Sequence, residues 1–223
     1  MQHSSVEERR RTDQDPGAAQ YRDDPLRFGV GARITAAVMS DRYADIIVGA
    51  LHSADPAGLS VHTGDVSTYV GGSEPDLLRY VTDLAAALAS SGEHVVLTVH
   101  LSRGCPGEVL CELPGGAGPR SVDVPSGRET GAFAAAEWAL YPLADDIREG
   151  FAPDHMRDIT AAIELAQANG TFHGSEHFVT RLEGDLGTVL ATAFAGWTMV
   201  GRTVQHVTSH LTLSVNSPSH DDV

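Results

Sequence analysis

The chain has 223 residues, of which 42% are hydrophobic and 20% charged, a composition typical of soluble globular proteins with room for two domains. Its 30 acidic residues against 15 basic ones give a net charge of −15, which disfavours binding to nucleic-acid phosphates and to anionic lipid. No apolar run is long enough to cross a membrane, and charges replace the apolar centre of a secretory signal at the start, so we expect a cytoplasmic protein.

The first half of the chain reads as a polar tail followed by one compact unit. Residues 1–26 are rich in Arg, Asp, Gln and Pro and lack periodicity, which predicts a disordered tail. Hydrophobic alternation and helical spacing predict the elements that follow. These are a strand at 28–38, a helix capped by Ser40 or Asp41 and ending near 55, a polar strand at 59–70, a helix from 73 to about 90, and a strand at 95–101.

The second half repeats this order after a connector rich in Gly, Pro and Ser. The polar pattern at 62–72 returns at 175–184, which indicates an internal duplication. The predicted elements are a strand at 134–142, a helix at 154–168 ended by Asn169-Gly170, a polar strand at 171–182, a helix at 185–200 and a strand at 207–215. Aligning the halves places Thr35 opposite Ala139, Thr68 opposite Thr180 and His94 opposite His210.

This order predicts an α+β fold made of tandem duplicated ferredoxin-like (βαββαβ) repeats with antiparallel sheets. In each repeat the helices would cover one sheet face and leave the other face for a ligand or a second sheet. The expected organisation is a tail at 1–26, a first repeat at 27–103, a connector at 104–131 and a second repeat at 132–219.

Several short motifs, in their order along the chain, resemble the YkoF family of thiamin- and hydroxymethylpyrimidine-binding proteins. The match covers roughly residues 28–219. The motifs are Asp65-Val66-Ser67-Thr68, Gly104-Cys105-Pro106-Gly107, Ala139-Leu140-Tyr141-Pro142, Ala168-Asn169-Gly170-Thr171-Phe172, Leu182-Glu183-Gly184-Asp185 and Asn216-Ser217-Pro218-Ser219.

The resemblance implies a cytosolic, non-catalytic binding protein that forms homodimers and offers one site per repeat for thiamin or its pyrimidine half. Some members accompany membrane transporters for that pyrimidine, which suggests a link to uptake or salvage of the vitamin. The first repeat departs from the pattern, because residues 35–38 lack the Leu-Tyr-Pro of the second repeat. The first site is therefore open to a different affinity or ligand.

A pocket for thiamin needs hydroxyls or carboxylates for the aminopyrimidine edge and an apolar or aromatic wall for the ring. We therefore expect ligand-binding residues at Thr35, Asp65 and Thr68 in the first repeat and at Glu137, Tyr141, His177 and Thr180 in the second. Each has a structural alternative. A strand threonine is a good β former, a carboxylate can face Arg33, Arg181 or water, and aromatic side chains commonly pack in the core.

Other chemistries find weaker support in the sequence. Histidines are frequent on the polar strands, but no metal-binding spacing is present, so we expect no metal and no cofactor beyond the bound ligand. Cys105 and Cys111 have neither a redox nor a zinc spacing and are interpreted as structural thiols. Two alternatives remain: an enzyme acting on a pyrimidine-like heterocycle with a histidine base, and a dimerisation or regulatory module that needs no ligand.

Overall fold

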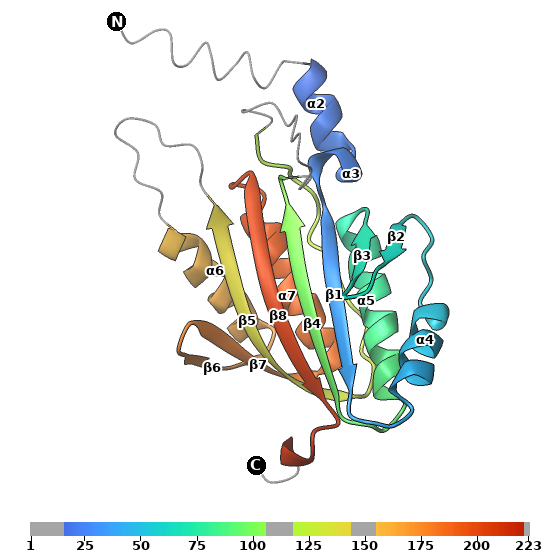
Figure 1. The fold of residues 1–223 in the computed structure, drawn as a ribbon. Helices are drawn as coiled ribbons and strands as arrows, with labels where there is room; N and C mark the ends of the chain where they lie inside the picture. Colours follow the sequence, from blue (N-terminus) through green and yellow to red (C-terminus); the bar gives the residue numbers. More distant parts are fainter. Residues whose placement is uncertain (1–15, 106–117, 144–154, 221–223) are drawn as a thin grey trace, which may run out of the picture.

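In the computed structural model, which describes residues 16–105, 118–143 and 155–220, the chain forms one antiparallel sheet of eight strands in the order β2-β3-β1-β4-β8-β5-β7-β6. The first repeat contains β1 Gly31–Val38, α4 Tyr43–Ser53, β2 Ser60–Thr63, β3 Thr68–Gly71, α5 Glu74–Ala89 and β4 Val95–Arg103. The second contains β5 Phe133–Leu143, α6 His155–Ala168, β6 Phe172–Glu176, β7 Val179–Asp185, α7 Leu186–Val200 and β8 His206–Val215. The tandem ferredoxin-like fold is thereby confirmed, and Figure 1 shows α5 and α7 behind the long central strands.

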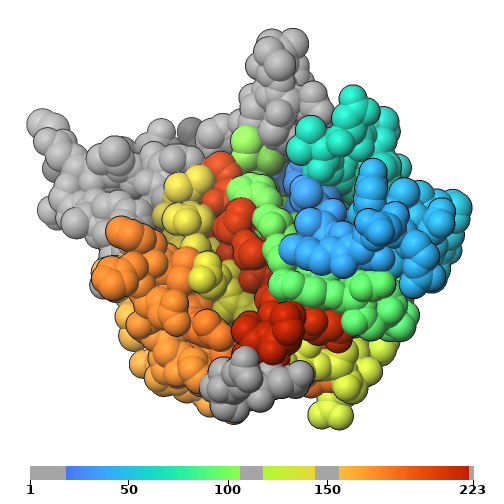
Figure 2. Space-filling view, turned by 60° about the horizontal axis from the view of Figure 1, so that its bottom comes forward, coloured from blue at the N-terminus to red at the C-terminus, as the bar shows by residue number. Residues whose placement is uncertain are grey.

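The two repeats are joined into one sheet along the pair β4 and β8, whose register sets Val99 opposite Leu211 at its centre. Strand pairings also correct the sequence alignment of the halves. An offset of 112 residues carries β4 onto the segment 207–215, so the counterpart of His94 is His206 and not His210. The same offset carries Thr68 onto Thr180, as expected. Figure 2 shows β8 in red between the two halves.

Each predicted polar strand is a hairpin of two short strands. In the first repeat, β2 and β3 are joined at residues 64–67, and Thr63 pairs with Thr68. In the second, β6 and β7 are joined at residues 177–178, and Ser175 pairs with Thr180. The prediction of one continuous strand was wrong because the turn residues Gly64 and Asp65 interrupt the ladder.

Side-chain caps are present at the predicted starts of two helices and absent at the start of a third. The Ser73 side chain accepts a hydrogen bond from Asp76 N at the start of α5, and Asp185 accepts from Gly187 N and Thr188 N at the start of α7. The start of α4 has no side-chain cap, because its N-cap residue is Arg42. The expectation of a cap at Ser40 or Asp41 was therefore wrong.

The expected disordered tail also differs from the structure over its second half. Helix α2 spans Pro16–Asp23 and α3 spans Pro25–Phe28, with the Asp24 side chain accepting from Leu26 N at 3.0 Å. A proline at the first turn and an acidic N-cap are good helix-start signals that outweigh the low hydrophobicity of the segment. Residues 1–15 lie outside the described part of the chain.

The sheet has one buried face and one open face. Alternate residues of the central strands are buried against the helices, as in β4, where Val95, Leu97, Val99 and Leu101 are each 1% exposed or less. Residues between them point to the opposite face, which no described α-helix covers. None of the described helices is both long and apolar enough to cross a bilayer.

A buried ionic cluster connects the repeats behind the sheet. Arg103, at the end of β4, is fully buried and pairs with Glu74 at 3.3 Å, while its guanidinium carbon lies 5.6 Å from the Trp197 ring of α7. Burial lowers the pKa of Arg103 to about 10, which leaves the guanidinium charged at neutral pH. Arg120 of the connector joins the same carboxylate at 3.3 Å.

Candidate binding pocket on the open face of the sheet

Two rows of polar side chains cross the open face. Strand register places Thr35, Thr98, Thr212, Glu137 and Arg181 side by side in one row. The neighbouring row contains Tyr69, Arg33, His100 and His210. Since successive residues of a strand alternate between faces, both rows point away from the helices.

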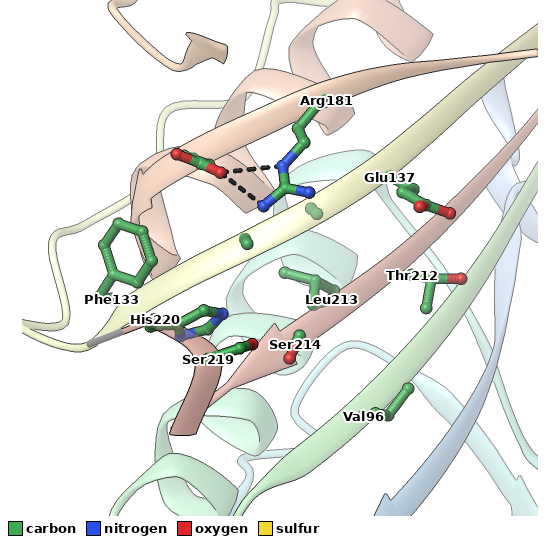
Figure 3. Close-up of a pocket in the computed structure, with 12 residues that line it drawn as sticks. Val96, Phe133, Glu137, Arg181, Thr212, Leu213, Ser214, Ser219 and His220 are labelled. Carbon is green, nitrogen blue, oxygen red and sulfur yellow. Dashed lines mark hydrogen bonds and ion pairs between the residues drawn. The ribbon is translucent and has the colours of Figure 1, made fainter. Parts of the chain in front are cut away.

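A pocket of ≈ 310 Å³ lies on this face in the second repeat. Strands β5, β7 and β8 form its floor, and the short 3-10 helix η1 Pro218–His220 forms one wall. Figure 3 shows Phe133 and His220 at one end of the pocket and Glu137 and Thr212 at the other. The size is near the lower end for small-molecule sites and suits a single heterocycle.

Arg181 carries the positive charge of the pocket and is paired with neighbouring carboxylates. Arg181 Nη2 lies 2.7 Å from Glu183 Oε1, and its Nε donates to the same oxygen at 2.9 Å. The other Glu183 oxygen lies 2.9 Å from His173 Nδ1, and Arg181 Nη1 lies 3.9 Å from Glu176. The guanidinium is therefore turned towards protein carboxylates, and its orientation is fixed by a charge-assisted pair.

Glu137 is the second carboxylate of the pocket, and it differs from Glu183 in its contacts. No group in the described part of the chain forms a hydrogen bond or an ion pair with it, although Arg181 is its register neighbour on β7. At the other end, the rings of Phe133 and His220 meet edge to face with their centroids 5.0 Å apart. The pocket thus combines one available carboxylate with an aromatic wall.

The first repeat has a tyrosine where the second repeat has this pocket. This tyrosine is Tyr69, which occupies the position of Arg181 in the second repeat. Its ring lies against Gly31 and Gly71. These two glycines are the counterparts of Ala135 and Glu183. A Cβ at Gly31 would lie 3.2 Å from Tyr69 Cε2, and a Cβ at Gly71 would overlap the Tyr69 hydroxyl. The ring is therefore accommodated by the two glycines.

The predicted site residues fall into three groups. On the open face are Thr35, Glu137 and Tyr141, of which Glu137 lines the pocket and Thr35 donates to Val66 O at 3.3 Å. At the exposed hairpin tips are Asp65 and His177, in equivalent positions of the two repeats. On the helix-facing side are Thr68 and Thr180, which are 6% and 8% exposed, and Thr68 Oγ1 is 3.1 Å from Thr63 Oγ1.

Side chains on opposite faces of one sheet do not line the same pocket. The structure therefore separates Thr68 from Thr35 and Thr180 from Glu137, residues that the sequence had grouped together. Ligand contact by any of the seven residues stays a prediction. Trp138 packs in the core on the helix-facing side, where its indole N–H donates to Ser209 at 2.8 Å.

Two histidines of the open face, His100 and His210, lie next to each other. His100 and His210 are register partners with ring centroids 6.3 Å apart. Burial, followed by the charge of His210, lowers the pKa of His100. Within residues 16–105, 118–143 and 155–220, no three His, Cys, Asp or Glu side chains gather in a way that would hold a metal ion. Cys105 is a free thiol, and Cys111 lies outside the described residues.

Sequence reasoning missed most of the pocket lining. Glu183 was available from the pattern, because it lies two positions after Arg181 on one strand and so shares its face. Phe133 begins β5 one residue before the predicted strand. Only the folded chain brings His220 from the C-terminal region over the start of β5, and no local signal predicts that contact.

Fold and pocket together define a tandem ferredoxin-like protein with a small polar and aromatic pocket on its open sheet face. The YKOF-related family model matches residues 29–108 and 133–220, one region in each repeat, and the chain belongs to this family. A relative from Bacillus subtilis (strain 168), named "Putative HMP/thiamine-binding protein YkoF", is 32% identical over 193 residues, which cover 85% of this chain and 91% of the relative.

Proposed function

We propose that the protein binds thiamin or its hydroxymethylpyrimidine moiety without chemical conversion, and that the second repeat holds this ligand in the open-face pocket. The name of the Bacillus subtilis relative and the family membership support the ligand class. The observation that carries the location is the Glu137 carboxylate, which has no hydrogen-bond or ion-pair partner among the described residues and lies inside a pocket of ≈ 310 Å³. A carboxylate without a protein partner is suited to accept hydrogen bonds from a ligand amine.

The pocket chemistry matches an aminopyrimidine on three sides. Glu137 accepts from the exocyclic amine, and the Thr212 hydroxyl, which can donate or accept, lies beside it in the row to serve a ring nitrogen. Phe133 and His220 offer an aromatic surface for the flat ring. In thiamin, the cationic thiazolium would gain from the two pocket carboxylates.

Isothermal titration tests the proposal directly. Wild-type protein should give a saturable heat with thiamin or with the free pyrimidine, and Glu137→Gln should weaken that binding by about tenfold, since a charge-assisted hydrogen bond becomes a neutral one. Glu164→Gln is the matched control, because Glu164 is an exposed carboxylate on α6, across the sheet from the pocket. Absence of heat with both ligands at millimolar concentration would refute the proposal.

A second candidate location is the pair of helix-facing hydroxyls in each repeat. Thr63 with Thr68 and Ser175 with Thr180 occupy equivalent hairpin positions, and this equivalence supports one site per repeat. Thr68→Ala and Thr180→Ala should each weaken one site and leave the other unchanged. Identical titrations for both variants and the wild type would leave the hydroxyl pairs with a structural role only.

The remaining parts of the proposal concern context. We infer a cytoplasmic protein that acts in uptake or salvage of the vitamin beside a membrane transporter, and whose ligand is recovered unchanged after long incubation. We also infer a homodimer. Exposed Tyr141 and Leu143 near the end of β5 support an interface there, since they are 50% and 39% exposed. Tyr141→Glu should then favour the monomer in sedimentation experiments, and an unchanged sedimentation profile would contradict this interface.

A further inference from the structure

We infer that the open-face pocket selects unphosphorylated ligands: it takes a neutral or cationic aminopyrimidine and rejects the phosphate ester of the same ring. This inference rests on the proposed function and adds the charge class of the ligand. Phosphate binding in proteins uses available cations, most often arginine forks, or free backbone N–H groups. The described pocket lining offers no arginine or lysine that is free of a carboxylate partner.

Among the described residues that line the pocket, Arg181 is the only Arg or Lys, and it is already engaged. Two of its three guanidinium nitrogens contact Glu183, at 2.7 and 2.9 Å, and the third is directed towards Glu176. A phosphate that recruited this fork would leave Glu183 in the same pocket without its strongest partner. Losing an existing charge-assisted pair makes the exchange unfavourable.

The formal charge of the pocket is negative. Glu137 and Glu183 outnumber Arg181 by one charge when the histidines are counted as neutral, and the whole chain carries −15. A phosphate monoester adds roughly −1.5 to −2 charges at pH 7 and would meet the Glu137 carboxylate, which no described residue neutralises, at short range. The same carboxylate attracts an amine or a thiazolium, so one residue both recruits and discriminates.

The test compares each free ligand with its phosphate ester by isothermal titration. For the hydroxymethylpyrimidine, whose phosphate would sit close to the ring, wild-type protein should bind the ester at least about tenfold more weakly than the free compound. The ratio of the dissociation constant of the ester to that of the free compound should become smaller as the salt concentration rises to about 1 M. Screening weakens charge repulsion but does not weaken a steric clash. Inorganic phosphate should fail to displace the bound pyrimidine.

Two variants and a control separate the contributions. Glu137→Gln should lower the ratio of ester to free-ligand dissociation constants, and Glu183→Gln should lower it further by releasing Arg181 for the phosphate. Glu164→Gln should leave the ratio at its wild-type value. Far-UV circular dichroism of each variant establishes that it is folded.

The outcomes are distinct. Equal or tighter binding of the ester by the wild type would overturn the inference while leaving the proposed function intact. A ratio unchanged in both Glu137→Gln and Glu183→Gln would overturn it as well, because the discrimination would then not come from the pocket charges. Failure of every ligand to bind would refute the proposed function itself.

Discussion

Asp185 links the pocket-bearing strand β7 to helix α7 and to the connector, and its two carboxylate oxygens have separate tasks. Oδ1 accepts from Gly187 N at 2.8 Å and from Thr188 N at 3.1 Å, which caps α7. Oδ2 accepts from Thr130 N, Thr130 Oγ1 and Gly131 N at 2.9, 3.2 and 2.7 Å, which ties the connector to the sheet next to Phe133. Substitutions can therefore remove one task or both.

The two tasks give different expected losses of unfolding free energy. Asp185→Ala removes the cap, about 1 kcal/mol, together with the connector bonds, for a total of about 2–3 kcal/mol. Asp185→Asn keeps an oxygen for the cap and loses the second acceptor, so we expect about 1–2 kcal/mol. Asp123→Ala, an exposed connector carboxylate, is the control and should change stability by less than about 0.5 kcal/mol.

Urea denaturation at several pH values measures these effects. Burial raises the pKa of Asp185, but hydrogen bonds from Thr130, Gly131 and Thr188 outweigh it and lower the pKa in the folded protein. The stabilisation is therefore present above the unfolded pKa, near 3.9, and is lost as the pH falls through the folded value. Equal losses for Asp185→Ala and Asp185→Asn at pH 7 would refute the division of tasks, and so would a loss that does not shrink in acid.

Three further predictions concern the open face and the core. Tyr69→Ala should lower the free energy of unfolding by about 1–2 kcal/mol in urea denaturation, since the ring also contacts the Arg33 cation at 5.6 Å; a loss under about 0.3 kcal/mol would contradict this. Because the pKa of His100 is lowered, stability should fall as the pH drops below about 6.5, and His100→Gln should reduce that fall in thermal melts. Trp138→Phe should lower the free energy of unfolding by about 2 kcal/mol in urea denaturation, because the hydrogen bond to Ser209 is lost; a loss under about 0.5 kcal/mol would contradict this prediction.

The fold was predictable because its long elements carry strong periodic signals. The alternation along β5 separates Ala136, Trp138 and Leu140 from Glu137 and Tyr141, and the structure places these groups on opposite faces as predicted. Gly170 ends α6 with a positive φ of 70°, which the Asn-Gly pair had indicated. The remaining helices and strands were predictable because the two repeats have the same order of elements.

The candidate site was less predictable, since it depends on register and on distant contacts. The hairpins reverse direction within each polar stretch, and this sets Thr68 and Thr180 against the helices instead of beside Glu137. A slip of one residue moves a side chain to the other face, and sequence patterns do not fix the register of short edge strands. The wall formed by His220 comes from a segment far from Glu137 in sequence.

The most direct test of the central claim is a crystal structure of the protein soaked with the hydroxymethylpyrimidine. The account predicts ligand density on the open face of the second repeat, with the exocyclic amine within hydrogen-bonding distance of Glu137 and the ring against Phe133 and His220. Density for the ligand on the helix-facing side, or an unoccupied pocket in crystals that bind the ligand elsewhere, would contradict it.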